Sequence, residues 1–120
     1  MQKIFYLGFG ILMMMSCSSV KHKDVVYGQS KSKEDLKLNI FVPNNSENKK
    51  LPVLVFVHGG NWNSGNKDQY GFFGRNFAKK DVVTVIPSYT LSPKANVDEM
   101  TSEIAEAIKW VQKNISKYNG

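Results

Sequence analysis

The run Pro52-Val53-Leu54-Val55-Phe56-Val57-His58-Gly59-Gly60-Asn61-Trp62 joins a wholly apolar segment to a glycine pair. Its first six residues carry no charge and are rich in Val, which is typical of a strand buried on both faces of a parallel sheet. Two adjacent glycines let the backbone turn sharply and leave its N–H groups unobstructed by a Cβ atom. The run therefore predicts a buried strand that ends in a loop able to hold an oxyanion.

Strand patterns lie on both sides of this run. Residues 25–27 and 36–41 predict two antiparallel strands before it, and Pro43 ends the second of them. Residues 82–86 are again continuously apolar apart from one threonine and predict a second buried strand, ended by Pro87. Nothing in the sequence repeats.

Two segments have the spacing of amphipathic helices. Residues 70–79 predict a helix whose apolar face is formed by Tyr70, Phe73, Phe77 and Ala78. A longer helix is predicted from Asn96, with Glu99 completing a capping box, to about Tyr118, where Asn119-Gly120 provides a stop. Strands that alternate with helices predict an α/β fold with right-handed crossovers over a mostly parallel sheet.

The N-terminus predicts export. Lys3 precedes an apolar run over residues 4–15, which is too short to span a bilayer and is followed by small residues, as in a secretory signal peptide. Cys17 is the single cysteine, so an intrachain disulfide and a cysteine-based metal site are excluded.

Residues 14–19 resemble the lipobox of bacterial lipoproteins, although Met14 stands where Leu is preferred. The resemblance implies lipidation of Cys17, and an ordinary cleaved signal peptide is the alternative. We therefore expect a signal peptide over residues 1–16, a polar tether over 17–24 and a folded domain over 25–120. The expected location is the periplasm or the cell surface, on a membrane through the lipid anchor.

The composition and the distribution of charge indicate which classes of partner the protein can bind. The chain has 120 residues, 42% of them hydrophobic and 22% charged, which is ordinary for a globular protein. The net charge of +6 comes from lysines scattered over the sequence, with one arginine and no basic stripe. This distribution argues against nucleic-acid binding.

From Tyr27 to Tyr118 the chain resembles the N-terminal half of the α/β-hydrolase esterases, in the lipase, feruloyl-esterase and kynurenine-formamidase-like group whose oxyanion loop is His-Gly-Gly-x-Trp. The matching segments are residues 38–43, 52–62, 65–67, 88–93 and 103–110. The resemblance implies the N-terminal half of an α/β-hydrolase sheet, incomplete, with two antiparallel strands followed by parallel strands and crossover helices.

The same resemblance assigns the site. Gly59, Gly60 and Asn61 are expected to form the oxyanion loop, with the N–H groups of Gly60 and Asn61 facing the oxyanion and Gly59 permitting the turn. His58 is expected to brace the loop rather than to transfer a proton. Asn61 departs from the family, which commonly has Gly there.

Other expected residues surround this loop. Trp62 and Tyr89 are expected at the rim of the substrate site. Glu103 stands where the family's helix usually has Asp. The family requires no metal and no organic cofactor, and its substrates are small-molecule esters.

The family's nucleophile, a serine in Gly-x-Ser-x-Gly, is missing from these 120 residues. Ser30 comes nearest, with Gly28 two residues before it but Ser32 two residues after it. The two histidines are His22, in the expected tether, and His58. We therefore expect a truncated member of a serine carboxylic-ester hydrolase family, without nucleophile, acid or base and inactive alone.

Two further expectations follow. Residues 52–57 should form an open sheet edge that accepts a complementing C-terminal half or drives self-association. The alternative function is a non-catalytic exported lipoprotein that binds a ligand at a rim of Trp62, Tyr70 and Tyr89.

Overall fold

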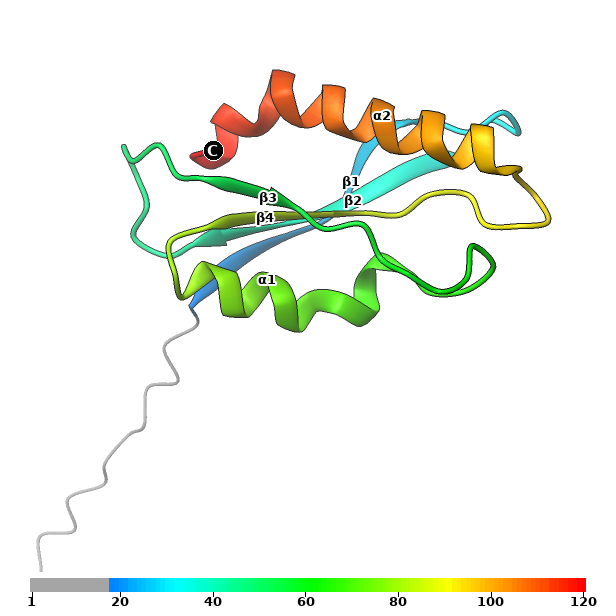
Figure 1. Ribbon diagram of the computed structural model, residues 1–120. Coiled ribbons are helices and arrows are strands. Elements are labelled where there is room, and N and C mark those ends of the chain that lie inside the picture. The colour runs from blue at the N-terminus through cyan, green and yellow to red at the C-terminus, as the bar shows by residue number, and fades with distance from the viewer. Residues whose placement is uncertain (1–17) are drawn as a thin grey trace, which may run out of the picture.

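Four strands form one sheet in the order β1-β2-β4-β3 in the computed structural model, which describes residues 18–120 (Figure 1). β1 (Ser19–Gln29) pairs antiparallel with β2 (Asp35–Pro43), and β2 pairs antiparallel with β4 (Val83–Pro87). β3 (Val53–Val55) lies parallel to β4. This mixed sheet confirms the predicted fold class, with two antiparallel strands followed by a parallel pair. The expected mostly parallel sheet is wrong for residues 18–120, because β1–β2 and β2–β4 pair antiparallel and only β3–β4 is parallel.

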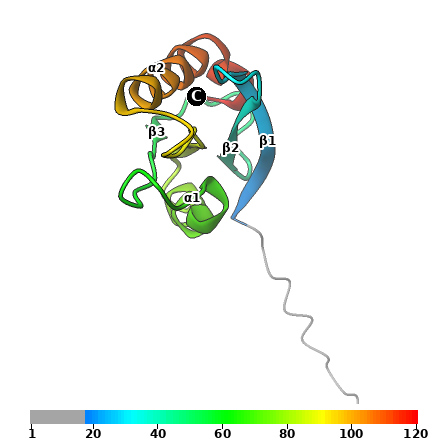
Figure 2. The same cartoon turned by 90° about the vertical axis from the view of Figure 1, so that its right-hand side faces the viewer.

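Helices cover both faces of the sheet. The short 3₁₀ helix η1 (Lys67–Tyr70) leads into α1 (Gly71–Ala78), and α2 (Val97–Asn114) continues into η2 (Ile115–Tyr118). The view along the sheet in Figure 2 shows α1 on one face and α2 on the other. The element order agrees with the sequence prediction.

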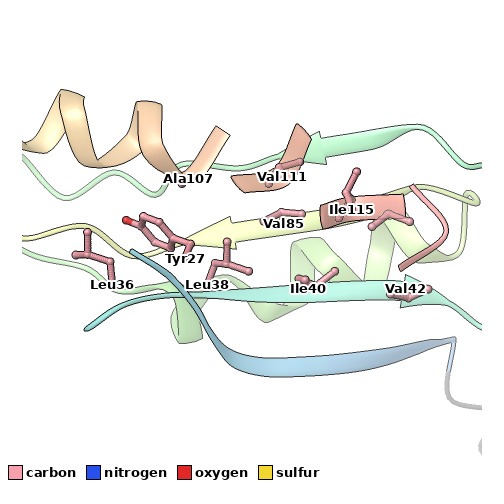
Figure 3. Packing of buried hydrophobic residues seen from close by; sticks show 10 residues of the cluster. Tyr27, Leu36, Leu38, Ile40, Val42, Val85, Ala107, Val111 and Ile115 are labelled. Atoms are coloured by element: carbon pink, nitrogen blue, oxygen red, sulfur yellow. The ribbon is translucent and has the colours of Figure 1, made fainter. Parts of the chain in front are cut away.

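The larger part of the core lies between the sheet and α2. Figure 3 shows side chains of β2 and β4 pointing toward the helix, where Ala107, Val111 and Ile115 meet them. Leu38 and Ile40 from β2 are fully buried there. Because α2 supplies one apolar stripe, its burial fixes the helix across the strands.

Contacts between α1 and the sheet differ from the predicted apolar face. The buried residues of α1 are Gly71, Gly74 and Ala78. A Cβ at Gly74 would lie 2.2 Å from the Phe41 ring, so the glycine lets this helix approach β2 closely. Of the predicted face, Ala78 is buried and Phe73 and Phe77 are half-buried, whereas Phe72 is exposed.

The predicted start of α2 and the predicted stop after Tyr118 are confirmed, although α2 itself ends at Asn114 and η2 forms the last turn. Asn96 Oδ1 accepts from Glu99 N at 2.9 Å, and Glu99 Oε2 accepts from Asn96 N at 3.0 Å, which completes the capping box. Asn119 follows η2 in the left-handed conformation and ends the helical segment.

The expected tether is wrong from Ser19 onward, because these residues already belong to β1. Their pairing with β2 is interrupted by irregularities between His22 and Val25 and between Val26 and Gly28. Such bulges break the alternation of apolar and polar residues that marks a strand. The expected signal peptide and Cys17 lie outside the described residues.

β3 is shorter and less buried than its sequence predicts. Its three residues are half-buried, and it lies at an edge of the sheet. The second apolar strand, β4, is fully buried as predicted.

Candidate functional site

The loop after β3 turns at Gly60. The Gly60 carbonyl accepts hydrogen bonds from Ser64 N (3.0 Å), Ser64 Oγ (2.7 Å) and Asn63 N (3.2 Å). Gly60 has φ +136°, and a Cβ there would lie 2.1 Å from Ser64 O. A side chain at this position is therefore excluded by both conformation and space.

In the same peptide group, the N–H of Asn61 points away from Ser64 because it lies opposite the Gly60 carbonyl. Across residues 18–120, no hydrogen bond uses the N–H of Gly60 or of Asn61. Asn61 has φ 53°, in the left-handed region that asparagine tolerates better than most residues. Two adjacent unpaired N–H groups are the arrangement that can bind an oxyanion.

Gly59 differs from Gly60. A Cβ at Gly59 would meet no atom within 4 Å, and its φ is not positive. The structural need for glycine therefore lies at Gly60, and also at Gly65, where a Cβ would lie 2.6 Å from Gly59 O.

His58 lies beneath the loop and is 2% exposed. Its ring stacks on Tyr89 (centroids 4.7 Å apart, 16° between planes) and faces Tyr70 at 6.0 Å. Its Nδ1 lies 3.0 Å from Gly59 O. These contacts hold the ring within the aromatic cluster and connect it to the loop backbone.

Tyr89 contacts His58 in a second way. Its hydroxyl donates to the His58 carbonyl at 3.0 Å. Burial, and to a smaller extent Tyr70, raises the pKa of this hydroxyl, so it remains a donor at neutral pH.

A hollow of about 360 Å³ opens over the loop and brings most of the predicted site residues together. It is lined by Val57, His58, Gly59, Gly60, Asn61, Trp62 and Tyr89. Trp62 is 50% exposed and meets Tyr89 edge-on at 6.3 Å. The hollow thus has apolar walls beside the two unpaired N–H groups.

The segment after β4 supports this hollow. Ser92 N donates to Trp62 O at 2.9 Å, and Tyr27 Oη donates to Ser88 O at 2.6 Å. Burial raises the pKa of the Tyr27 hydroxyl well above its usual value, with a smaller contribution from the charge of Glu103. The Tyr27 hydroxyl therefore stays protonated and keeps its bond.

A polar network of two buried side chains, Lys67 and Asn39, and two exposed carboxylates, Asp24 and Asp68, fixes the far end of the loop, and the sequence patterns did not indicate it. Lys67 is 6% exposed, and its Nζ pairs with Asp24 Oδ1 (2.5 Å) and Asp68 Oδ2 (3.2 Å). Asn39, fully buried on β2, donates to Asp68 Oδ1 at 2.9 Å and accepts from Asp24 N at 3.1 Å. The network ties η1 to β1 and β2.

The network also lowers the pKa values of its two carboxyl groups. The hydrogen bond from Lys67 lowers the pKa of Asp24. The Asn39 amide, followed by Lys67, lowers the pKa of Asp68. Only the tertiary fold brings Asp24 to Lys67, so no local pattern could identify the pair.

The remaining histidine lies elsewhere. His22, on β1, contacts Tyr118 edge-on at 4.9 Å and does not line the hollow. Within the described part of the chain, no group of three or more His, Cys, Asp or Glu side chains is arranged to hold a metal ion. Over residues 18–120, no helix has both the length and the hydropathy needed to cross a membrane.

Comparisons with known proteins identify the family. The family described as BD-FAE matches residues 38–120. Kynurenine formamidase of Danio rerio is 31% identical over 97 residues, which cover 81% of this chain and 32% of the relative. A probable isoprenylcysteine alpha-carbonyl methylesterase of Arabidopsis thaliana is 32% identical over 103 residues, covering 86% of this chain and 24% of the relative.

A solved structure supports the fold. Esterase B from Lactobacillus rhamnosis aligns with a TM-score of 0.75 at 20% identity, covering 84% of this chain and 32% of the esterase. The chain spans about a third or less of the length of the curated relatives it matches. The family match covers more than half of the chain, so the protein belongs to the BD-FAE family and has the α/β-hydrolase fold of the esterases.

Proposed function

We propose that residues 58–62 are the oxyanion loop of a serine carboxylic-ester hydrolase. The observation that carries this proposal is that the N–H groups of Gly60 and Asn61, two residues that line the hollow, have no hydrogen-bond partner within residues 18–120. Donors held in such a position stabilise the negative charge of a tetrahedral intermediate, and each contributes about 3 kcal/mol to lowering the barrier.

In the proposed reaction, these residues bind and polarise the ester. A serine oxygen attacks the ester carbonyl carbon, and the carbonyl oxygen becomes an oxyanion that accepts from Gly60 N–H and Asn61 N–H. The proton of the serine passes to the base that acts with it, and this base gives it to the alkoxy oxygen as the intermediate collapses and the alcohol leaves; water then hydrolyses the acyl-enzyme. His58 is stacked and bonded beneath the loop, so it holds the donors in place rather than accepting the serine proton.

The serine and its base are proposed to come from a segment outside these 120 residues, because no Gly-x-Ser-x-Gly occurs here. The edge of β3 that has no partner strand within residues 18–120 is the proposed docking position for a strand that carries this serine. Such a strand would bring the nucleophile to the loop that directly follows β3.

The substrate class follows from the walls of the hollow. Val57 and Trp62 are exposed there, and Tyr89 completes an apolar surface beside the two donors. An ester with a small apolar acyl or alkoxy group matches this surface. The esterase names of the relatives support the same class.

We expect the 120-residue chain alone to hydrolyse no p-nitrophenyl ester and to take no label from a fluorophosphonate, because it has no activated serine. A non-catalytic binding module, favoured by the half-exposed Trp62 ring, is the second candidate. The two are distinguished by adding the missing segment. Stoichiometric serine labelling of the chain alone would contradict the expectation.

The decisive experiment supplies a segment from a relative that carries the Gly-x-Ser-x-Gly strand, the acid and the histidine. Co-expression is expected to restore ester turnover. Gly60→Val keeps the backbone N–H, but its Cβ would clash with Ser64 O and displace the loop, so kcat is expected to fall by about 100-fold, a loss of the size caused by removing an oxyanion donor. Gly59→Ala serves as the control for folding, since its Cβ meets no atom within 4 Å. A folded, co-purifying complex without turnover would favour the binding module.

We also propose that Cys17 is lipidated and that the protein is an exported lipoprotein at a membrane. The lipobox-like sequence supports this proposal. Because β1 starts at Ser19, the anchor would hold the domain within a few residues of the bilayer rather than on a tether. Metabolic labelling with a fatty-acid analogue is expected to label the wild type and not Cys17→Ala, whereas equal labelling of both would exclude the anchor.

A further inference from the structure

Glu103 is a buried carboxylate with an unusual set of partners. It lies on α2, is 8% exposed, and accepts from Thr90 N at 2.6 Å (Oε2) and from Thr90 Oγ1 at 2.9 Å (Oε1). No lysine or arginine among residues 18–120 lies within ion-pair distance of it. A buried carboxylate without a cation is costly unless hydrogen bonds satisfy it, so both bonds to Thr90 are needed.

The residues next to Thr90 reach the oxyanion loop at both ends. On one side, Tyr89 stacks on the His58 ring and donates to the His58 carbonyl. On the other side, Ser92 N donates to Trp62 O at 2.9 Å. The position of Thr90 therefore sets the position of two contacts that flank Gly60 and Asn61.

We propose that Glu103 is a positioning residue for the oxyanion loop, acting through Thr90 and the Tyr89 and Ser92 contacts. The inference rests on the proposed function, since the loop stabilises an oxyanion only in an ester hydrolase. The coupling itself is a property of this chain. Losing the bonds of Glu103 should loosen the loop without loosening the sheet.

Hydrogen exchange measured by mass spectrometry tests the coupling on the 120-residue chain in any state of association. The reporters are the amides of Asn63 and Ser64, which bond to Gly60 O, and of Ser92. Glu103→Gln keeps the side-chain shape but removes the charge and one of two acceptors. It is expected to speed exchange at these reporters about tenfold, while β2 and β4 change by less than about twofold.

The matched control is Glu106→Gln, the same charge change one helical turn along α2 at an exposed side chain without a bond to Thr90. It is expected to leave the reporters unchanged. Unchanged reporters in Glu103→Gln would overturn the proposal. An equal increase over β2 and β4 would also overturn it, because Glu103 would then support only the fold.

Two variants at Thr90 keep the test valid if Glu103→Gln does not fold. Thr90→Ser keeps both donors, and Thr90→Val keeps the shape but loses the hydroxyl donor. We expect Ser to preserve slow exchange at the reporters and Val to speed it. The opposite result would show that the methyl group, through packing, matters rather than the hydrogen bond, and would overturn the proposal.

Turnover separates this inference from the proposed function. In the complemented protein, Glu103→Gln is expected to lower kcat about tenfold with little change in KM, as for an interaction made in the transition state. If no complemented protein is active but exchange responds as expected, the proposed function fails and the coupling stands. If the protein is active and exchange at the loop does not respond, the coupling fails alone.

Discussion

β3 and β4 are neighbouring parallel strands with similar apolar sequences, and yet their surroundings differ. In β4, Val83, Val85 and Ile86 are each 0% exposed. In β3, every residue is half-buried, and Val57 just beyond it is 40% exposed. Within residues 18–120, β4 has a strand on either side, whereas β3 has only β4.

The hydrogen bonds of β3 show which of its backbone groups have no partner strand within residues 18–120. Phe56 N donates to Val85 O at 2.8 Å, and Pro52 O accepts from Val83 N at 3.0 Å. Alternate residues of a strand bond to the same side, so the backbone groups of Val53 and Val55 face the open edge. The apolar sequence of β3 is typical of a strand with a neighbour on each side, but β3 lies at an edge of the sheet. The mutations below test the consequences of this position.

The largest expected effect concerns association. The chain alone is expected to self-associate through β3, because this edge is apolar, uncharged and unpaired within the described residues. Val55→Pro removes an N–H that faces the open edge and should shift the chain toward monomer with the sheet intact. Size-exclusion chromatography with light scattering measures the change.

Leu54→Pro is the matched control for this edge. Leu54 lies between Pro52 and Phe56 on the side that bonds to β4, so proline there should disrupt the sheet itself. A monodisperse wild-type monomer with slowly exchanging amides at Val53 and Val55 would show that the edge is closed in some other way.

A smaller effect is expected from matched truncations within the two strands. Ile86→Ala in β4 should reduce the free energy of unfolding by about 3 kcal/mol, because the side chain is fully buried. Leu54→Ala in β3 should cost about 1 kcal/mol, because part of its surface already contacts water. Urea denaturation of the two variants, each in the Val55→Pro background, measures both losses of unfolding free energy. Equal losses would show that β3 and β4 are equally buried in solution.

The sequence predicted local features well. The capping box at Asn96 and Glu99 and the left-handed stop at Asn119 need only neighbouring residues, and both are present. The burial of β3 was predicted wrongly. Its apolar sequence is typical of a strand with a neighbour on each side, and the sequence does not show that one of these neighbours is absent from residues 18–120. The start of β1 was missed because Asp24, with φ 57°, lies in an irregular stretch that breaks the alternation.

In the candidate site, too, the local features were predicted from the sequence and the contacts between distant segments were not. The glycine loop is a local motif, and Gly60 occupies the strained position within it. The sequence assigned the turn to Gly59, whereas the structure requires glycine at Gly60, because Ser64 folds back onto the turn there. The bonds of Thr90 and Lys67 join segments far apart in sequence, so they required the structure.

The smallest expected effect lies within β4. Thr84 is fully buried, and its Oγ1 has no hydrogen-bond partner within residues 18–120. An unpaired buried hydroxyl costs free energy that a methyl group of similar shape does not, so Thr84→Val should raise the free energy of unfolding by about 1 kcal/mol. The control is Thr101→Val on the exposed side of α2, where the hydroxyl donates to Val97 O at 2.7 Å and the expected change is within about 0.5 kcal/mol. Urea denaturation in the Val55→Pro background measures both variants. A loss of stability in Thr84→Val would mean that this hydroxyl is hydrogen-bonded in solution, and that β4 is less completely shielded from water than its burial indicates.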